Sequence, residues 1–155
     1  MRKLVICVMT LLCTCGAAPS SPLGDLQFLI GTWRCSYASG SQHGVYTASY
    51  APALNGSGLL QTDSWNGGGG DAAIYSYQAA TRRVNVTVVE ENGETTVFLG
   101  TPAGGRIAYR SVYPDSTAKE TFERVTGSEY TLGFTQTQHG KTIASKDVCV
   151  RTPSR

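Results

Sequence analysis

The chain has 155 residues, of which 41% are hydrophobic and only 15% are charged. This composition supplies enough apolar side chains for a folded core and excludes a disordered chain. The formal net charge of +2 falls to zero if an N-terminal segment containing Arg2 and Lys3 is removed. We therefore expect no nucleic-acid partner, because such partners are bound by basic surfaces. No later segment is apolar over the roughly 20 residues of a membrane span, so we expect no transmembrane span in the mature chain.

The N-terminus has the organisation of a signal peptide over residues 1–17. Arg2 and Lys3 form a basic region ahead of the apolar run 4–12, and cleavage after Ala17 satisfies the small-x-small rule. The protein is therefore expected to be secreted or periplasmic, with one domain at 18–155. An alternative is that the segment ending at Cys15 acts as a bacterial lipobox, which would leave the protein lipid-anchored through Cys15.

The remaining chain reads as short strands preceded by a helical turn. The apolar run 23–30 predicts one or two helical turns, which we expect to plug one end of the fold. From Trp33 onward, alternating runs are separated by turn residues every 8–12 positions, which is typical of an all-β sandwich or barrel. We predict ten strands, at 32–38, 43–51, 57–65, 72–78, 82–90, 94–100, 105–113, 117–124, 129–137 and 141–151.

Short connections between these strands favour antiparallel pairing of neighbours. Asn92-Gly93 and His139-Gly140 each predict a type I′ hairpin turn, which needs positive φ at both central residues. The fold class is therefore all-β, a single antiparallel up-and-down β-barrel of about ten strands with the N-terminal helical turn as plug.

The cysteines give a constraint on how the barrel closes. Five are present, and signal-peptide cleavage would remove all except Cys35 and Cys149, which can pair only with each other. Closure places the first and last strands side by side and antiparallel. If Cys35 lies directly opposite Cys149, then Trp33 lies opposite Arg151. The Arg151 guanidinium over the Trp33 ring would seal one end of the barrel by a cation–π contact.

The turn at 139–140 supplies a second, independent register. It places apolar side chains of the last two strands on the same face as Trp33, and a slip of one residue would destroy this agreement. We predict that the inward-facing Tyr37, Tyr130, Phe134 and Asp147 contact a ligand in the lumen. Asp147, opposite Tyr37, would accept the phenol proton or orient a polar group of the ligand; solvation at the rim is the alternative.

The hairpin before that turn has two alternative registers. A three-residue loop at 126–128 places Phe122 inward, whereas a two-residue loop places Thr121 and Glu123 inward. We prefer the three-residue loop because it buries Phe122.

The segment Phe28-Leu29-Ile30-Gly31-Thr32-Trp33 resembles the Gly-x-Trp opening of calycin-type barrels, the superfamily of lipocalins, fatty-acid-binding proteins and haem-binding nitrobindins. Together with segment 77–83, it is most similar to a family of exported bacterial proteins of unknown function with an FL-x-G-x-W opening. The resemblance implies a calycin-like barrel across the mature chain, and an arginine across the motif tryptophan, as in lipocalins, would be Arg151. The chain lacks the other lipocalin signatures, the helix after the lipocalin barrel and the lid helices of fatty-acid-binding proteins.

Residues capable of cofactor chemistry are few. The resemblance to nitrobindins implies haem held by a histidine, but His43 and His139 are expected at a loop edge and in a turn. We predict no cofactor and no metal, with haem as the alternative, because two cysteines and scattered histidines do not make a metal site. Glu90, Glu91 and Glu94 are interpreted as a solvated cluster at a hairpin tip.

Three aromatic residues near the glycine run 67–70, namely Trp65, Tyr75 and Tyr77, could line one mouth of the barrel, although core packing explains them as well. We predict a monomeric, non-catalytic binding protein that holds a small apolar or amphipathic molecule in the lumen. The alternatives are a haem-binding or isomerase-like barrel enzyme and a ligand-free structural protein of the cell envelope.

Overall fold

A computed structural model of the chain describes residues 22–78, 80–81, 83–114 and 117–153. The predicted signal peptide, its cleavage site and the lipobox alternative lie outside the described residues. Within them, two short 3₁₀ segments and ten strands follow one another: η1 (Pro22–Leu29), β1 (Gly31–Ser39), β2 (Gln42–Ala53), η2 (Leu54–Gly56), β3 (Gly58–Trp65), β4 (Ala72–Gln78), β5 (Arg83–Val89), β6 (Thr95–Ala103), β7 (Arg106–Tyr113), β8 (Lys119–Arg124), β9 (Glu129–Gln138) and β10 (Lys141–Arg151).

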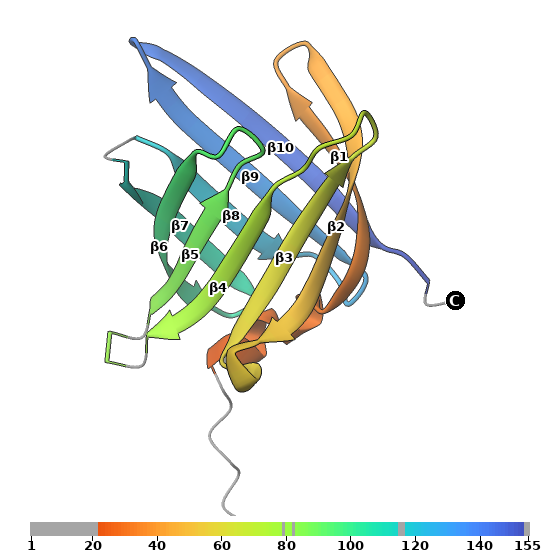
Figure 1. Ribbon diagram of the computed structural model, residues 1–155, viewed down its shortest axis with the longest axis vertical. Helices are drawn as coiled ribbons and strands as arrows, with labels where there is room; N and C mark the ends of the chain where they lie inside the picture. Colours follow the sequence, from red (N-terminus) through yellow and green to blue (C-terminus); the bar gives the residue numbers. More distant parts are fainter. Residues whose placement is uncertain (1–21, 79, 82, 115–116, 154–155) are drawn as a thin grey trace, which may run out of the picture.

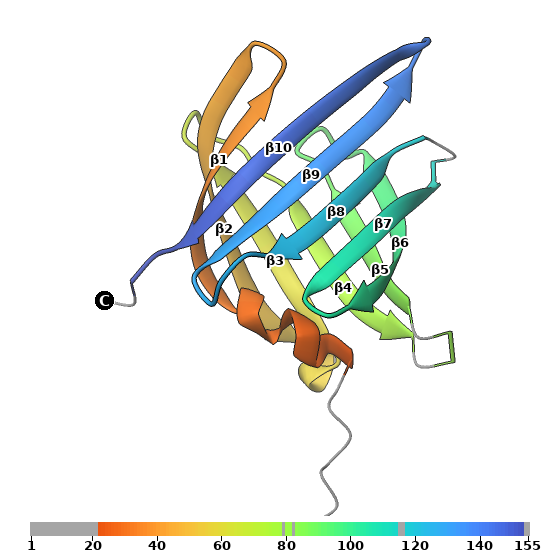
Figure 2. The same cartoon turned by 180° about the vertical axis from the view of Figure 1, so that it is seen from behind.

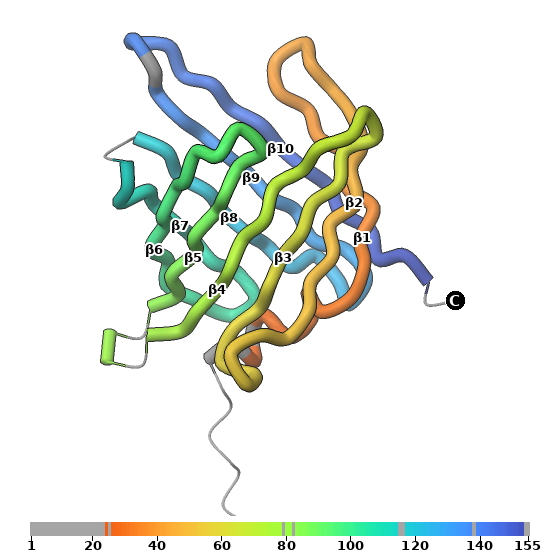
Figure 3. Tube along the Cα trace, viewed as in Figure 1, coloured from red at the N-terminus to blue at the C-terminus, as the bar shows by residue number. Residues whose placement is uncertain are grey.

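These strands close into one antiparallel barrel, as predicted (Figures 1 and 2). Each strand pairs with its neighbours in sequence, and β1 pairs with β10 to complete the ring. The alternation of the sequence explains the sheet: in β7, Ile107, Tyr109 and Ser111 are buried, while the residues between them are exposed. The Cα trace shows the β1–β2 and β9–β10 hairpins extending furthest at the end opposite η1 (Figure 3).

The seam between β1 and β10 has the predicted register. Cys35 lies opposite Cys149 and forms a disulfide with it, and Trp33 lies opposite Arg151. The two cysteines are 114 residues apart in sequence, so the disulfide closes a very long loop of the unfolded chain. In the chain-entropy model, such a loop stabilises the folded state by up to about 4.7 kcal/mol.

The predicted type I′ turn is confirmed at one of the two hairpins and is wrong at the other. His139 and Gly140 both have positive φ, 49° and 75°, which confirms the type I′ turn. At Asn92-Gly93 the prediction is wrong, because only Gly93 has positive φ. The connection is longer than two residues: the Glu94 N–H donates to Asn92 Oδ1 at 2.8 Å, which satisfies the turn without positive φ at Asn92.

The β8–β9 hairpin has the preferred three-residue register. Phe122 lies opposite Leu132, and Arg124 lies opposite Tyr130. Phe122 is consequently only 2% exposed.

One end of the barrel is closed by η1, which lies across it in Figure 2, and we call this closure the floor. Leu26 and Leu29 of η1 are buried in the core, and the Trp33 Nε1–H donates to the Leu29 carbonyl at 2.6 Å. The Arg151 guanidinium lies 4.3 Å from the centroid of the Trp33 ring. Arg151 also donates to the carbonyl oxygen of Ile30, at 2.6 Å, and to that of Phe28.

Gly31 makes this arrangement sterically feasible. Its φ is +124°, and a Cβ atom there would lie 2.8 Å from Arg151 Nη1. A side chain at this position would therefore meet both backbone strain and the guanidinium. This is the physical reason for glycine in the Gly-x-Trp opening of this chain.

Candidate functional site

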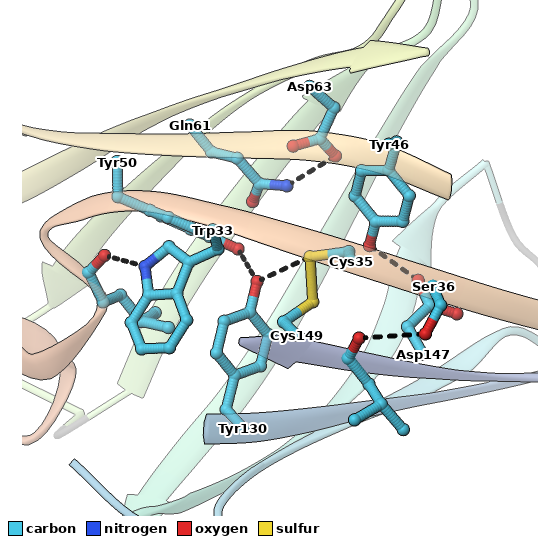
Figure 4. The surroundings of a disulfide bond; sticks show 12 residues. Trp33, Cys35, Ser36, Tyr46, Tyr50, Gln61, Asp63, Tyr130, Asp147 and Cys149 are labelled. Atoms are coloured by element: carbon cyan, nitrogen blue, oxygen red, sulfur yellow. Dashed lines mark hydrogen bonds between the residues drawn. A yellow bond between two sulfur atoms is a disulfide. The ribbon is translucent and has the colours of Figure 1, made fainter. Parts of the chain in front are cut away.

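Above the floor, the interior is filled by a layer of aromatic rings. The Tyr130 ring is stacked with Phe122 at 5.4 Å and lies edge-on to Trp33 at 4.9 Å. The Tyr130 and Tyr50 hydroxyl groups are 3.0 Å apart and hydrogen-bonded, next to the disulfide (Figure 4). Trp33, Phe122 and Tyr130 in this layer are each at most 2% exposed, so the layer is part of the hydrophobic core.

Two adjacent cavities lie in the other half. The outer cavity, of about 480 Å³, is near the β5–β6 and β7–β8 connections. The inner cavity, of about 190 Å³, extends to the aromatic layer at Tyr75. Both are bounded by Asp71, Val88, Glu120 and Phe134, so they share one wall. A cavity of this combined size has the dimensions of a small-molecule site.

The inner cavity contains a hydrogen-bonded carboxylate on β10. The Tyr46 hydroxyl donates to Asp147 Oδ2 at 2.6 Å (Figure 4), and Asp147 is 8% exposed. Burial raises the pKa of Asp147, whereas the hydrogen bond from Tyr46 lowers it. Asp147 is thus held in one orientation by Tyr46 of β2, a strand that β1 separates from β10.

A second polar chain comes from β3 and β4. The Tyr75 hydroxyl donates to Gln61 Oε1 at 2.5 Å, and Gln61 Nε2 donates to Asp63 Oδ2 at 2.8 Å. The other oxygen, Asp63 Oδ1, is buried, and no described residue donates a hydrogen bond to it. The pKa of Asp63 is raised to about 7, and burial is the largest cause. The hydrogen bond from Gln61 acts in the opposite direction and lowers this pKa.

Glu120 on β8 faces the same space and belongs to both cavities. Burial raises the pKa of Glu120 to about 8, and the negative charges of Asp147 and Asp63 raise it further. Directly opposite on β7, Tyr109 is 3% exposed, and its hydroxyl has no hydrogen-bond partner among the described residues. Carboxyl groups with such raised pKa values occur mostly at functional sites.

Aromatic rings form the opposite side of the inner cavity. The Trp65 ring lies 4.6 Å from the Tyr46 ring and 5.4 Å, edge-on, from the Tyr37 ring. Tyr37 fits there because Gly44 has no side chain: a Cβ at Gly44 would lie 2.5 Å from the Tyr37 ring. The cavity can therefore offer ring faces and carboxylates to one ligand.

The structure separates the four predicted lumen residues. Phe134 and Asp147 line the inner cavity, and Phe134 lines the outer cavity as well. Tyr130 lies in the aromatic layer and is 1% exposed, so it supports the cavity from below. Tyr37 is half-buried behind Trp65.

The three aromatic residues near the glycine run 67–70 lie in different surroundings. Trp65 and Tyr75 line the inner cavity. Tyr77 packs against the core as a partly buried residue.

The solvated glutamate cluster is partly a wrong interpretation. Glu91 is exposed, but Glu90 is half-buried and lines the outer cavity together with Glu94. Burial raises the pKa of Glu90, with further contributions from the negative charges of Asp71 and Glu94. The β5–β6 turn brings these side chains over the barrel opening.

Sequence reasoning missed the carboxyl groups of Asp63, Asp71 and Glu120. The inward orientation of two of them, Glu120 and Asp63, could have been predicted from the alternation of residues along their strands. The register that turns Phe122 inward also turns Glu120 inward, since alternate residues share a face. Likewise, Asp63 lies on the same face of β3 as Gln61 and Trp65, because every second residue of a strand shares a face.

Neither histidine fits a haem site. His43 is exposed in β2, and His139 is exposed in the β9–β10 turn. Neither is among the described residues that line the two cavities. Over the described ranges, no group of three His, Cys, Asp or Glu side chains is arranged to hold a metal ion.

The chain matches no protein-family model, and no curated protein matches its sequence. Its fold is similar to that of Rv2717c from M. tuberculosis, with a TM-score of 0.62 and 15% sequence identity over 89% of this chain and 100% of that one. It is also similar to the S-type phycobiliprotein lyase CPES from Guillardia theta, with a TM-score of 0.57 and 16% identity over 83% and 90% of the two chains. These similarities show that the β-barrel fold of this chain is shared with both proteins.

A helix long and apolar enough to cross a membrane is not found in the described part of the chain. The Cys35–Cys149 disulfide is typical of proteins outside the reducing cytoplasm.

Proposed function

We propose that the protein is a non-catalytic binding protein that holds a small amphipathic molecule in the two cavities. The observation that carries this proposal is the contrast between a floor made of buried side chains and an upper barrel with cavities of about 480 and 190 Å³. A barrel with a purely structural role gains stability from filling its interior, because empty space forfeits packing contacts. The cavity walls mix Val88, Phe98 and Phe134 with carboxyl groups, which suits a ligand with an apolar body and a polar end.

Native mass spectrometry of the protein, gently purified from its own host, tests the proposal. We expect a species heavier than the polypeptide by the mass of one small molecule. Val88→Trp should abolish this species, because Val88 lines both cavities. Val89→Trp is the matched control, since Val89 is the next residue of β5 and is 45% exposed. A bare polypeptide mass for the unaltered protein, or retention of the adduct by Val88→Trp, contradicts the proposal.

We further propose that the protein is exported as a monomer and belongs to the bacterial family with the FL-x-G-x-W opening. The signal-peptide pattern at 1–17 and the disulfide support export. N-terminal analysis of the protein recovered from outside the cytoplasm should find Ala18 as the first residue, whereas an intact Met1 contradicts export and an acylated Cys15 identifies the lipobox route. A monomer is expected because one chain forms the whole cavity; sedimentation as a dimer contradicts it.

A further inference from the structure

The charged side chains that line the two cavities are all acidic. Six of the eleven acidic side chains of the sequence line the two cavities: Asp63, Asp71, Glu90, Glu94, Glu120 and Asp147. None of the described lysine, arginine or histidine residues does so. The whole chain, in contrast, has more basic than acidic residues, 13 against 11. The negative lining is therefore a property of the cavities and not of the protein as a whole.

Within the inner cavity, Asp63 and Glu120 have carboxyl oxygens without a hydrogen-bond partner among the described residues. Asp63 Oδ1 is buried, and none of the residues that the structure describes donates a hydrogen bond to it. Glu120 has no hydrogen bond or ion pair with any described residue, and the charges that act on it, Asp147 and Asp63, are negative. Placing unpaired carboxylates out of water destabilises a protein unless a donor or a cation reaches them. The cavity thus presents carboxyl oxygens that can accept hydrogen bonds from a cationic ligand.

The geometry distinguishes the kind of cation. A metal ion needs several ligands converging on one point, and no described group of three such side chains does so. The carboxyl groups are instead distributed along both cavities, from Asp147 near the aromatic layer to Glu94 at the opening. Between them lie the rings of Tyr46, Trp65 and Phe134. Ring faces attract ammonium groups, and apolar walls accommodate the carbon skeleton that carries them.

We propose that the ligand of this barrel is an organic cation, an amine-bearing molecule with an aromatic or aliphatic body. The negative charges of Asp63, Glu120 and Asp147 attract its ammonium group, and the rings of Tyr46, Trp65 and Phe134 contact its apolar body. The outer residues Asp71, Glu90 and Glu94 attract cations toward the opening. This inference rests on the proposed function, because it assigns a ligand class to the same cavity.

Three probes with one phenyl body test the charge preference: phenethylamine, 2-phenylethanol and phenylacetate, titrated calorimetrically at pH 8 into the full chain freed of bound ligand. We expect phenethylamine to bind at least about tenfold more tightly than 2-phenylethanol, which is a difference of about 1.4 kcal/mol. Phenylacetate should bind most weakly. Equal or tighter binding of either other probe overturns the cation inference but leaves the proposed function standing. Failure of all three probes to bind contradicts both proposals.

A pair of variants on β8 assigns the effect to the cavity. Glu120→Gln keeps the side-chain shape, so it should weaken phenethylamine binding at least about fivefold and leave 2-phenylethanol binding unchanged. Glu123→Gln, an exposed residue of the same strand, should change neither. If the two variants weaken phenethylamine binding equally, the effect comes from net charge alone and the inference is wrong.

Discussion

The two halves of the barrel are built from the same ten strands but bury different chemistry. At the floor, polar groups are paired: Trp33 donates to Leu29, and the Arg151 guanidinium donates to two backbone carbonyls. In the upper half, Asp63 Oδ1 and the Tyr109 hydroxyl are buried with no hydrogen-bond partner in the described part of the chain, and the charges that act on Glu120 are negative. The lower half of the barrel therefore buries polar groups that are paired, whereas the upper half buries polar groups that are not, which lowers its contribution to stability.

Removing the disulfide should produce the largest effect on stability. The variant C35A/C149A is expected to lose about 2–5 kcal/mol of unfolding free energy, because the unfolded chain regains the freedom of a loop spanning 114 residues. Denaturant unfolding measures this loss. The native adduct should persist in the folded variant, since neither cysteine lines a cavity. A loss below about 1 kcal/mol would show that the disulfide between β1 and β10 contributes little to stability, which contradicts the role given to the lower half of the barrel.

Arg151→Leu is expected to have the second-largest effect, a loss of about 2–3 kcal/mol of unfolding free energy. The variant removes the cation–π contact with Trp33 and leaves the carbonyl groups of Phe28 and Ile30 without their donor. Arg34→Leu is the control, because Arg34 is exposed on the outside of β1, and it should change stability by less than about 0.5 kcal/mol. Thermal unfolding of both proteins distinguishes them; equal losses would contradict the role given to the floor.

Glu120→Gln should act in the opposite direction and depend on pH. The pKa of Glu120 is about 8 in the folded protein against an ordinary value of 4.5, so the folded state holds the proton between these values while the unfolded state releases it. The ligand-free protein should therefore lose stability as pH rises from about 4.5 to 8. Above pH 8, Glu120→Gln is expected to be more stable than the unaltered protein by roughly 1–3 kcal/mol.

Denaturant unfolding at pH 5 and pH 9 checks this prediction. Glu123→Gln provides the exposed control, for which the pH dependence should match that of the unaltered protein. Identical pH dependence in Glu120→Gln would mean that Glu120 is not the carboxyl group responsible.

The lower half of the barrel could be predicted from sequence because its information is redundant. The cysteine pair specifies the β1–β10 register, which sets Trp33 opposite Arg151, and the 139–140 turn specifies the β9–β10 register. The two registers independently assign the same apolar side chains to one face. The failure at Asn92 has a local cause: the side chain of Asn92 closes the turn in a way that the dipeptide Asn-Gly does not distinguish from type I′.

The upper half could be predicted only in part. Alternation patterns identify inward faces by their apolar residues, so an inward carboxyl group such as Glu120 looks like an interruption of the pattern. Asp147 was found because the seam register passes through it. Asp71 precedes β4 in a connection, where no strand register applies. Recognising these residues as one lining requires knowing that the space between them is hollow.

The titration of the Glu120 carboxyl group tests the central claim most directly. Carbon-detected NMR of the glutamate side chains, with Glu120→Gln to assign the resonance, should give a pKa of about 8 in the ligand-free protein. Saturation with phenethylamine should lower this pKa by at least about one unit, since a bound cation at tenfold preference favours the ionised form. A pKa near 4.5 without ligand, or one that phenethylamine leaves unchanged, would contradict the proposal that the partly buried Glu120 carboxyl group binds a cation.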